Sequence, residues 1–480
     1  MRLFALNKPG VQSVAGVERA FLRCGWGSIL MGRLSHASIA QRVKAGRRLR
    51  EKVPRKSHRG WKAPANRPNP IELLIESDAG RIPGLLPIRY ARMRQSPFAF
   101  LRGAAALMAF DLAQMPTTGL RVQACGDCHI MNFGAFASPE RNLIFDINDF
   151  DETLPAPWEW DLKRLTASIE IAGRVAGANS RHREDAVRAA VRSYREHLGE
   201  YAQMPSLEVW YQRIDFQELI ERVPGPKNRK RDRIIAERAR RETVPITLLP
   251  STAGSNTRIK DHPPLIYHLP SQRTAAYRRR AASTFRRYRD SLATSYRVLF
   301  DRFELLDVAL KVVGIGSVGT FCEVALFRDA QAAPLFLQIK EARASVLEPY
   351  AGRSLSSTHG QRVVYGQRLM QAASDIFLGW MVGLQRGRQF YVRQLRDMKI
   401  AMPVDTTDPE DLAYFADACG RALALAHART GDPAMIAGYL GSSEAFDDAI
   451  VKFADSYADQ TERDYESLLK AIKNRRIKVG

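Results

Sequence analysis

The residues best suited to chemistry lie in one stretch between Cys125 and Glu152. It begins Cys-Gly-Asp-Cys-His-Ile-Met-Asn-Phe-Gly and, after a polar turn, continues Leu-Ile-Phe-Asp-Ile-Asn-Asp-Phe-Asp-Glu. Two apolar runs, at 133–137 and 143–147, flank the polar turn. This pattern predicts two strands joined as a hairpin.

A hairpin would bring the polar residues at its two ends together. Asp127 and Asn132 precede the first strand, whereas Asp149 and Asp151 follow the second. Oxygen ligands of this kind suit Mg²⁺, which takes one or two carboxylates and completes its shell with phosphate and water. The stretch therefore predicts a magnesium site.

The spacing from Asp127 to Asn132 fits the catalytic-loop pattern Asp-x-x-x-x-Asn of kinase-type enzymes. In that pattern the Asp accepts the proton of the acceptor hydroxyl and the Asn holds metal. The longer string Gly126-Asp-x-His129-x-x-Asn resembles the His-Gly-Asp-x-His-x-x-Asn loop of the aminoglycoside phosphotransferase and choline kinase group. The resemblance implies catalytic roles for Asp127 and His129. One difference is Cys125, which stands where that group has its first His.

Two later segments extend this resemblance. Ile147-Asn-Asp149-Phe resembles the Ile-Asp-Phe segment whose Asp binds Mg²⁺, and Asp151 is a further expected ligand. Trp-Glu-Trp-Asp161-Leu resembles the helix-opening Asp-Leu that braces the catalytic loop. The strings Asn-Asp-Phe-Asp-Glu and Trp-Glu-Trp-Asp-Leu-Lys-Arg also resemble a bacterial domain-of-unknown-function family, over roughly residues 53–471.

Three other interpretations of the stretch remain open. Cys125-x-x-Cys128-His129 matches the attachment motif of c-type haem, but haem attachment requires export and no signal peptide is predicted. Asp127-x-His129 with Asp149 could begin a two-metal phosphoesterase site, although no later Asn-His or His-x-His supplies further ligands. The carboxylates could also simply cap helices and bind loop amides in buried turns.

A second group of candidate residues forms a Gly-x-Gly-x-x-Gly pattern, comprising Gly314, Gly316, Ser317 and Gly319. Such loops cradle phosphates in dinucleotide sites and in kinases. A dinucleotide site requires a helix next, whereas 320–327 alternates as a strand does. The next predicted strand, 335–342, carries Lys340 in the place of the kinase lysine that contacts the α and β phosphates.

The acid that should pair with Lys340 is not evident. In kinases this lysine pairs with a Glu of the following helix. The helix predicted at 360–374 contains no acid, which leaves Glu341 and Glu348 as candidates.

Two arginines, Arg89 and Arg92, are predicted to bind phosphate. They lie among aromatic residues before a helix predicted at about 97–114, which leads toward Cys125. Arginine binds phosphate through two parallel hydrogen bonds. The alternative is a solvated helix face whose arginines pair with acids.

Composition bounds the class of protein. A chain of 480 residues predicts two or three lobes. The net charge of +22 and the pI near 10.0 predict affinity for polyanions, including non-specific affinity for nucleic acid. Five widely spaced cysteines indicate a reducing compartment, and no apolar run is as long as a membrane span. These features predict a cytoplasmic protein.

We therefore predict an α+β protein kinase-like fold with two lobes, in which the catalytic motif precedes the glycine loop, the reverse of the order in ordinary kinases. The predicted segments are a disordered basic tail (1–50), a helix-rich lobe with the catalytic motif (51–300), a small antiparallel-sheet lobe (301–402) and C-terminal helices on the large lobe (403–480). His427, at a helix end, is expected to be a core or capping residue.

The predicted function is an ATP- and Mg²⁺-dependent phosphotransferase that acts on an unknown hydroxyl-bearing acceptor. The alternatives are a non-catalytic pseudokinase, a basic nucleic-acid-binding module and a metal-dependent phosphoesterase. If one nucleotide contacts both motifs, the Lys340 ammonium and the Asp149 carboxylate should lie within about 10 Å of each other. At least one arginine of the segment 89–102 should be nearby.

Overall fold

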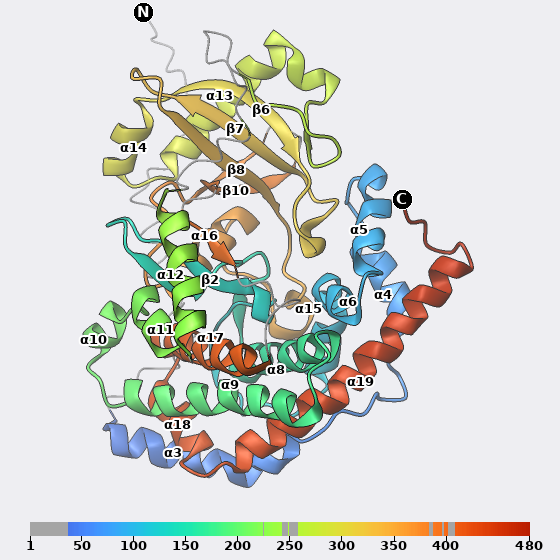
Figure 1. Cartoon of the computed structure of the whole chain (residues 1–480), viewed down its shortest axis with the longest axis vertical. Coiled ribbons are helices and arrows are strands. Elements are labelled where there is room, and N and C mark those ends of the chain that lie inside the picture. Colours follow the sequence, from blue (N-terminus) through green and yellow to red (C-terminus); the bar gives the residue numbers. More distant parts are fainter. Residues whose placement is uncertain are drawn as a thin grey trace, which may run out of the picture.

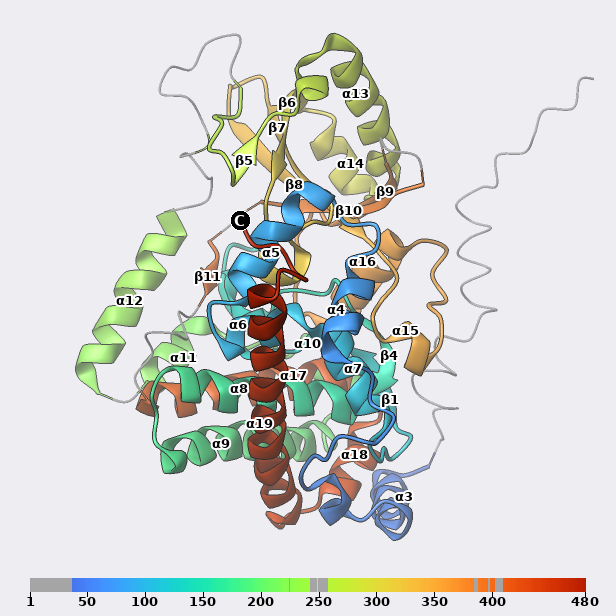
Figure 2. The ribbon, with the colours of Figure 1, turned by 90° about the vertical axis from the view of Figure 1, so that its right-hand side faces the viewer.

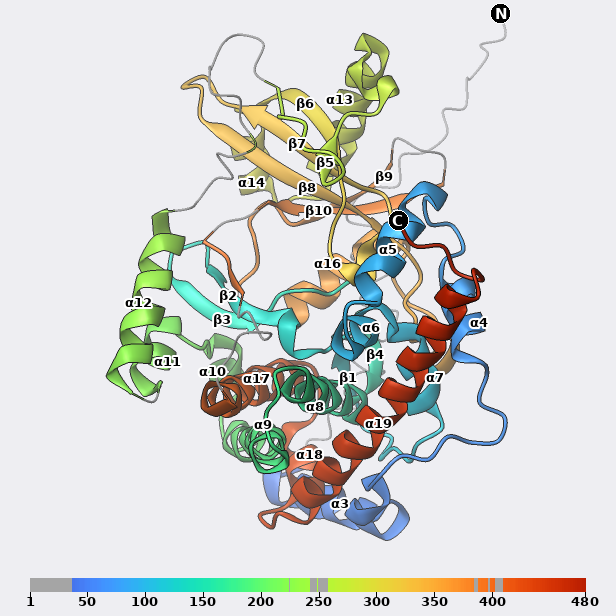
Figure 3. The ribbon, with the colours of Figure 1, turned by 45° about the vertical axis from the view of Figure 1, so that its right-hand side comes forward.

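The computed structural model describes residues 37–223, 225–241, 248, 258–383, 387–395, 398–401 and 409–480. A six-stranded antiparallel sheet forms one end of the molecule, and long helices form the other (Figure 1). A short hairpin lies between the sheet and the helices (Figure 3). Helices and antiparallel strands that are largely segregated confirm the α+β class.

The large sheet consists of β5 (Ile266–Tyr267), β6 (Glu304–Lys311), β7 (Cys322–Arg328), β8 (Pro334–Ala342), β9 (Gly379–Val382) and β10 (Gln389–Gln394). Their order in the sheet is β5-β6-β7-β8-β10-β9. The central strands β7 and β8 are buried along most of their length and consist mainly of apolar residues, as strands covered on both faces do. The strands predicted at 320–327 and 335–342 are therefore present within two residues of their predicted bounds.

Two helices, α13 (Ala275–Asp290) and α14 (Thr294–Phe300), pack on this sheet. The buried side chains of α13 recur at helical spacing, at Tyr277, Ala281, Phe285 and Tyr288. Such a stripe packs on a neighbouring layer, while Arg279, Arg280, Arg286 and Arg287 between its members are exposed. Phe285 meets Phe327 of β7 edge to face, with ring centroids 4.9 Å apart. The sequence analysis assigns these helices to the helix-rich segment 51–300. In the structure they share an apolar core with the large sheet and belong to that end of the molecule.

The predicted hairpin has the predicted bounds, with β2 (Phe133–Ala137) paired to β3 (Leu143–Ile147). A further strand, β11 (Ile400–Ala401), pairs with β2. A second antiparallel pair consists of β1 (Arg121–Ala124) and β4 (Leu154–Pro157). Because the chain before β2 and the chain after β3 are both held by strand pairs, the segments 125–132 and 148–153 lie side by side.

The helical part is built from α8 (Trp158–Val175), α9 (Ser180–Tyr201), α17 (Pro409–Thr430), α18 (Pro433–Leu440) and α19 (Ala445–Lys473). All five lie within the segments 51–300 and 403–480, which the sequence predicts to be helical. The helix α8 lies at the centre, and nearly all of its side chains are buried. Helices α17 and α9 approach closely at Gly420, where a Cβ atom would lie 2.2 Å from the Ala190 carbonyl oxygen.

The prediction of a disordered tail over residues 1–50 is wrong for its last part. Residues 1–36 lie outside the described residues, but α3 (Ile39–Lys52) is a helix with a capping box between Ser38 and Gln41. It packs on α18, and Arg50 donates to the carbonyls of Tyr439 and Gly438 at 2.7 Å each. These contacts satisfy backbone acceptors at the C-terminal end of α18.

Shorter helices carry the chain around this core. They are α4 (Pro70–Ser77), α5 (Leu86–Met93), α6 (Pro97–Gly103), α7 (Ala105–Ala113), α10 (Ser206–Tyr211), α11 (Phe216–Arg222), α12 (Pro226–Arg241), α15 (Glu348–Ala351) and α16 (His359–Met370). The single helix predicted at 97–114 is broken at Ala104, whose backbone is not helical. The basic helix α12 lies at the edge of the molecule and is mostly exposed (Figure 2).

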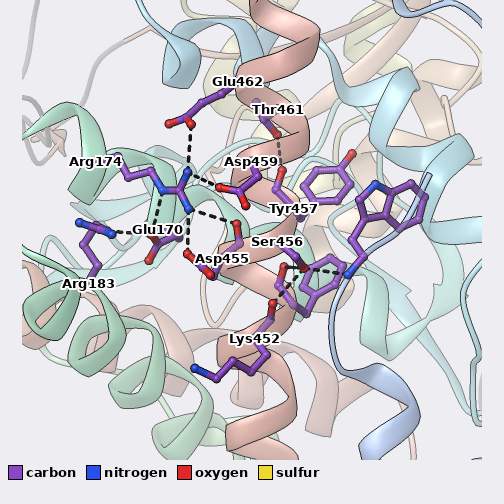
Figure 4. Close-up of polar contacts among 12 residues, drawn as sticks. Glu170, Arg174, Arg183, Lys452, Asp455, Ser456, Tyr457, Asp459, Thr461 and Glu462 are labelled. Atoms are coloured by element: carbon purple, nitrogen blue, oxygen red, sulfur yellow. Dashed lines mark hydrogen bonds and ion pairs between the residues drawn. The ribbon is translucent and has the colours of Figure 1, made fainter.

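The guanidinium of Arg174 joins α8 to α19 (Figure 4). It contacts Glu170 at 3.0 Å within α8. On α19 it contacts Asp455 and Asp459 at 2.8 Å each and Glu462 at 3.0 Å. One half-buried cation therefore offsets four carboxylates, which makes a network rather than an isolated surface pair.

Arg174→Ala should lower the free energy of unfolding by about 1–2 kcal/mol, because the four acids lose their common cation while water still screens the exposed ones. Arg181→Ala is the matched control. Its side chain is 89% exposed and lies 4.0 Å from Asp185, so its change should stay within about 0.5 kcal/mol. Urea unfolding of both variants would measure the difference, and equal effects would contradict this account.

Candidate functional site

The loop that carries the Asp127-x-x-x-x-Asn132 motif is held by a carboxylate from the first turn of α8. Asp161 accepts hydrogen bonds from the backbone amides of Cys125 (2.6 Å) and Gly126 (2.9 Å). His427 lies 3.3 Å from the same carboxylate, and its other ring nitrogen contacts the Tyr194 hydroxyl at 2.8 Å. His427 is fully buried, as expected of a core histidine. This series of contacts thus fixes the backbone that carries Asp127.

Gly126 also joins this loop to the segment that follows the hairpin. Its φ of +84° lies in the left-handed region, which glycine adopts without a steric penalty. A Cβ atom there would lie 2.4 Å from the Glu152 carbonyl oxygen. The two acidic segments therefore approach as closely as their backbones allow.

Asp127 is held in its ionised form. Arg164, one turn after Asp161 on α8, donates to its carboxylate from Nε at 2.6 Å. Burial works to raise the pKa of Asp127, but the charge and hydrogen bond of Arg164, together with the other positive charge nearby, outweigh burial and the pKa is lowered. Asn132 donates from its side-chain amide to the Asp127 carbonyl at 2.6 Å, which fixes the orientation of both.

His129 lies beside Asp127, with 4.0 Å between Nε2 and the carboxylate. Burial lowers the pKa of His129 to about 3 against the opposing charge of Asp127, so the ring is neutral at physiological pH. Its Nδ1 is buried and has no hydrogen-bond partner among the residues that the structure describes.

Lys340 of β8 meets both acids that follow the hairpin. Its ammonium lies 3.7 Å from the Asp149 carboxylate, which confirms the expected separation below about 10 Å. It lies closer to Asp151, at 2.6 Å. Burial alone would lower the pKa of Lys340, but the two carboxylates raise it well above its ordinary value. For Asp149, burial is likewise outweighed, chiefly by Lys340, and the pKa is lowered.

Neither Glu341 nor Glu348 pairs with Lys340, so that prediction is wrong. Glu341 points elsewhere, contacting Arg388 at 2.5 Å and accepting the Phe321 amide at 2.9 Å. Glu348 lies 3.8 Å from His359. Successive residues of a strand face opposite sides, which explains why Glu341 cannot share the environment of Lys340.

Arginines hold the glycine loop by its carbonyl oxygens. The bonds are Arg81 to Val318 (2.6 Å), Arg89 to Ile315 (3.2 Å) and Arg92 to Val313. A trans peptide directs its C=O and the next N–H to opposite sides. Each held carbonyl precedes a glycine of the pattern, so the glycine amides turn away from the arginines. Arg89 and Arg92, predicted as phosphate ligands, are thus engaged with the loop backbone.

A cavity of roughly 1130 Å³ joins these groups. Its described lining includes Asp127, His129, Asn132, Asp149, Asp151, Gly314, Gly316, Ser317, Lys340, Arg89 and Arg92. Gly319 is not among the described lining residues. Among the described lining residues, ten are Lys or Arg and seven are Asp or Glu, so these walls carry a surplus of positive charge. Such a cavity suits an anionic ligand of nucleotide size.

Sequence reasoning missed Arg164 and two residues of β10. Tyr391 lies opposite Lys340 and Arg393 opposite Gln338, so both stand on the face of the sheet that carries the lysine. Their alternation along the strand is the signal that could have found them. Arg164 follows Asp161 by three residues on a helix, which places both on one face.

The comparisons with known proteins bear on this site. Residues 81–471 match the family described as "Uncharacterized protein conserved in bacteria (DUF2252)". The chain belongs to this family. The matched range contains the catalytic motif, the glycine loop and the arginines that hold it, whereas α3 lies outside it. Comparison with curated proteins and with solved structures gives no significant match.

No group of three or more His, Cys, Asp or Glu side chains is placed to hold a metal ion within the described ranges. Mg²⁺ needs fewer protein ligands, since phosphates and water complete its shell. The carboxylate of Asp149 and the amide oxygen of Asn132 have the required hard-oxygen chemistry. In the same described ranges, no helix combines the length and apolarity needed to cross a membrane.

Gly126→Ala should lower the free energy of unfolding by about 2–5 kcal/mol, because it adds left-handed strain and a clash with the Glu152 backbone. Gly177→Ala is the matched control. It also has a positive φ, +74°, but no atom lies within 4 Å of its added Cβ. Its cost should be about 1 kcal/mol. Thermal melting would compare the two, and equal shifts would contradict the close approach at Gly126.

Proposed function

We propose that this protein is an ATP- and Mg²⁺-dependent phosphotransferase of the kinase type that acts on a hydroxyl-bearing acceptor. The observation that carries the proposal is the 3.7 Å contact between Lys340 and Asp149. These residues belong to two motifs that lie far apart in the sequence, and each motif separately indicates a phosphate or metal site. Their meeting in one cationic cavity supports a common ligand, a metal-bound triphosphate.

The connectivity of the sheet supports a kinase-like small lobe. The glycine loop joins β6 to β7, and the lysine stands on β8, the third strand when counted from β6. Kinases place their glycine loop and their lysine in this order. The catalytic motif comes earlier in the chain, so the proposal is a kinase-like fold whose two lobes are permuted in sequence.

In the proposed reaction Asp127 accepts a hydrogen bond from the acceptor hydroxyl. A bond forms between the acceptor oxygen and the γ-phosphorus, the bond from that phosphorus to the β–γ bridging oxygen breaks, and the hydroxyl proton passes to Asp127. Phosphoryl transfer through a loose transition state needs only a weak base. An aspartate whose pKa is lowered by Arg164 is therefore suited to orienting the hydroxyl.

The remaining groups bind the donor. Lys340 contacts its α and β phosphates, and the glycine amides cover them. Asn132 and Asp149 would hold Mg²⁺, which neutralises charge on the phosphates when bound. A pseudokinase would keep these binding contacts without transferring the phosphoryl group.

The exposed helix α12 supports a second candidate, binding of nucleic acid. It carries eight Lys or Arg in 16 residues, and Ile234 on it is 56% exposed. Backbone phosphates attract such a surface without sequence preference. The helix has no aromatic residue on which a base could stack, which makes this the weaker candidate.

Mg²⁺-ATP should raise the melting temperature of the purified protein, because a ligand that binds only the native state stabilises it. At about 100 times its Kd the gain is about 2.7 kcal/mol, which corresponds to several degrees. EDTA should reduce the shift. Saturating Mg²⁺-ATP that gives no shift, together with no heat of binding by calorimetry, would remove the enzyme proposal.

Asp127→Asn and Asp149→Asn should separate catalysis from binding. Asp127→Asn should abolish phosphoryl transfer to added hydroxyl acceptors or water and leave ATP affinity within about threefold, whereas Asp149→Asn should remove the strengthening of binding by Mg²⁺. Asp185→Asn, an exposed change on α9, is the control. If both site variants keep a dominant, salt-sensitive binding to DNA or RNA and the wild type transfers no phosphate, the nucleic-acid candidate stands instead.

A further inference from the structure

The helix that should supply an acid to Lys340 contributes an arginine instead. Kinases pair this lysine with a Glu of the following helix. In α16 the buried residue that contacts the acidic segment after the hairpin is Arg362, which is fully shielded from solvent. Its guanidinium donates to the backbone carbonyls of Asp151 (2.7 Å), Thr153 (2.5 Å) and Arg343 (2.8 Å). The helix therefore fixes the backbone of an acid rather than providing one.

Hydrogen-bond donors contact both carboxylate oxygens of Asp151, the acid whose backbone Arg362 fixes. One carboxylate oxygen of Asp151 accepts from Lys340 at 2.6 Å and from the Ser317 hydroxyl at 3.0 Å. The other accepts from the Tyr391 hydroxyl at 2.5 Å. These donors come from β8, the glycine loop and β10. Asp151 thus joins three parts of the sheet region to the segment after the hairpin.

We infer that Asp151 is the positioning residue for Lys340 and takes the place of the helix Glu. The helix contributes indirectly, because Arg362 of α16 holds the backbone carbonyl of Asp151. The inference rests on the proposed function, because it says how the lysine is held for the donor phosphates. It also removes Asp151 from the expected metal ligands. Both of its oxygens already face donors, whereas Asp149 lies a longer 3.7 Å from the lysine.

The contact with Ser317 extends the role of Asp151 to the glycine loop. Because Ser317 belongs to the glycine loop, the same carboxylate orients the lysine and the loop that covers the phosphates. Loss of the carboxylate should therefore weaken contacts with phosphate that need no metal. A metal ligand behaves differently, because its loss weakens only the part of binding that Mg²⁺ provides.

The test measures ATP affinity by calorimetry in EDTA and in saturating Mg²⁺ for the full chain. Asp151→Asn should weaken affinity in EDTA about tenfold, the size expected for a charge-assisted contact, and keep the wild-type strengthening by Mg²⁺. Asp149→Asn should leave the affinity in EDTA nearly unchanged and remove the strengthening by Mg²⁺. Glu304→Gln is the matched control, since this exposed acid lies on β6 of the same sheet and is not among the described residues that line the cavity, and it should change affinity by less than about twofold.

A double-mutant cycle with Lys340→Met distinguishes positioning from general stability. In that background Asp151→Asn should add only about a two- to threefold effect, because the lysine is gone and only the contact with Ser317 of the glycine loop is lost. An undiminished tenfold effect, or loss of the Mg²⁺ strengthening in Asp151→Asn, would overturn the inference. Wild-type protein that binds no ATP in either buffer would instead reject the proposed function itself, and the inference with it.

A milder variant covers the case in which Asp151→Asn fails to fold. Tyr391→Phe removes only the hydroxyl that holds one Asp151 oxygen and keeps the aromatic ring in the core. It should weaken ATP affinity in EDTA about two- to fivefold with the Mg²⁺ strengthening unchanged. Unchanged affinity in EDTA, with a normal melting curve, would overturn the positioning role.

Discussion

The burial of one lysine charge couples the two ends of this molecule. Lys340 is only 3% exposed, and an ammonium taken out of water without a partner costs several kcal/mol. The sheet that carries it offers no carboxylate at that point, so the charge is compensated from outside, by Asp149 and Asp151 after the hairpin. The position of the sheet over the hairpin is therefore an electrostatic requirement as well as a matter of apolar packing.

This compensation works only because the acidic segments are themselves held. Asp161 bonds two successive amides of the preceding loop, and the strand pair β1–β4 closes the stretch at its base. Behind Asp161 stand His427 and Tyr194, from α17 and α9. The side chains of the helical core thus determine where the carboxylates point. Arg164 and Arg362 extend the same support from α8 and α16.

Local patterns predicted much of this arrangement, and contacts between distant segments account for most of what was missed. The hairpin and the strand that carries Lys340 follow from alternation and turn residues, which neighbours in the chain determine. The partner of Lys340 could not be predicted, because a kinase comparison points to the next helix and the actual acid lies across the cavity. For α3, the capping box at Ser38 was a readable signal that the basic composition obscured.

The contacts around the glycine loop have an electrostatic consequence. An arginine that bonds a carboxylate is neutralised, but one that bonds a neutral carbonyl keeps its whole charge. Arg92 donates to the Val313 carbonyl, and basic side chains outnumber acidic ones in the described lining, so the cavity retains a positive potential between low-dielectric walls. Such a field draws anions in from solution, and dissolved salt weakens it over a Debye length of about 8 Å. The rate at which an anionic ligand would arrive is thereby set in part by bonds whose structural role is to hold a loop.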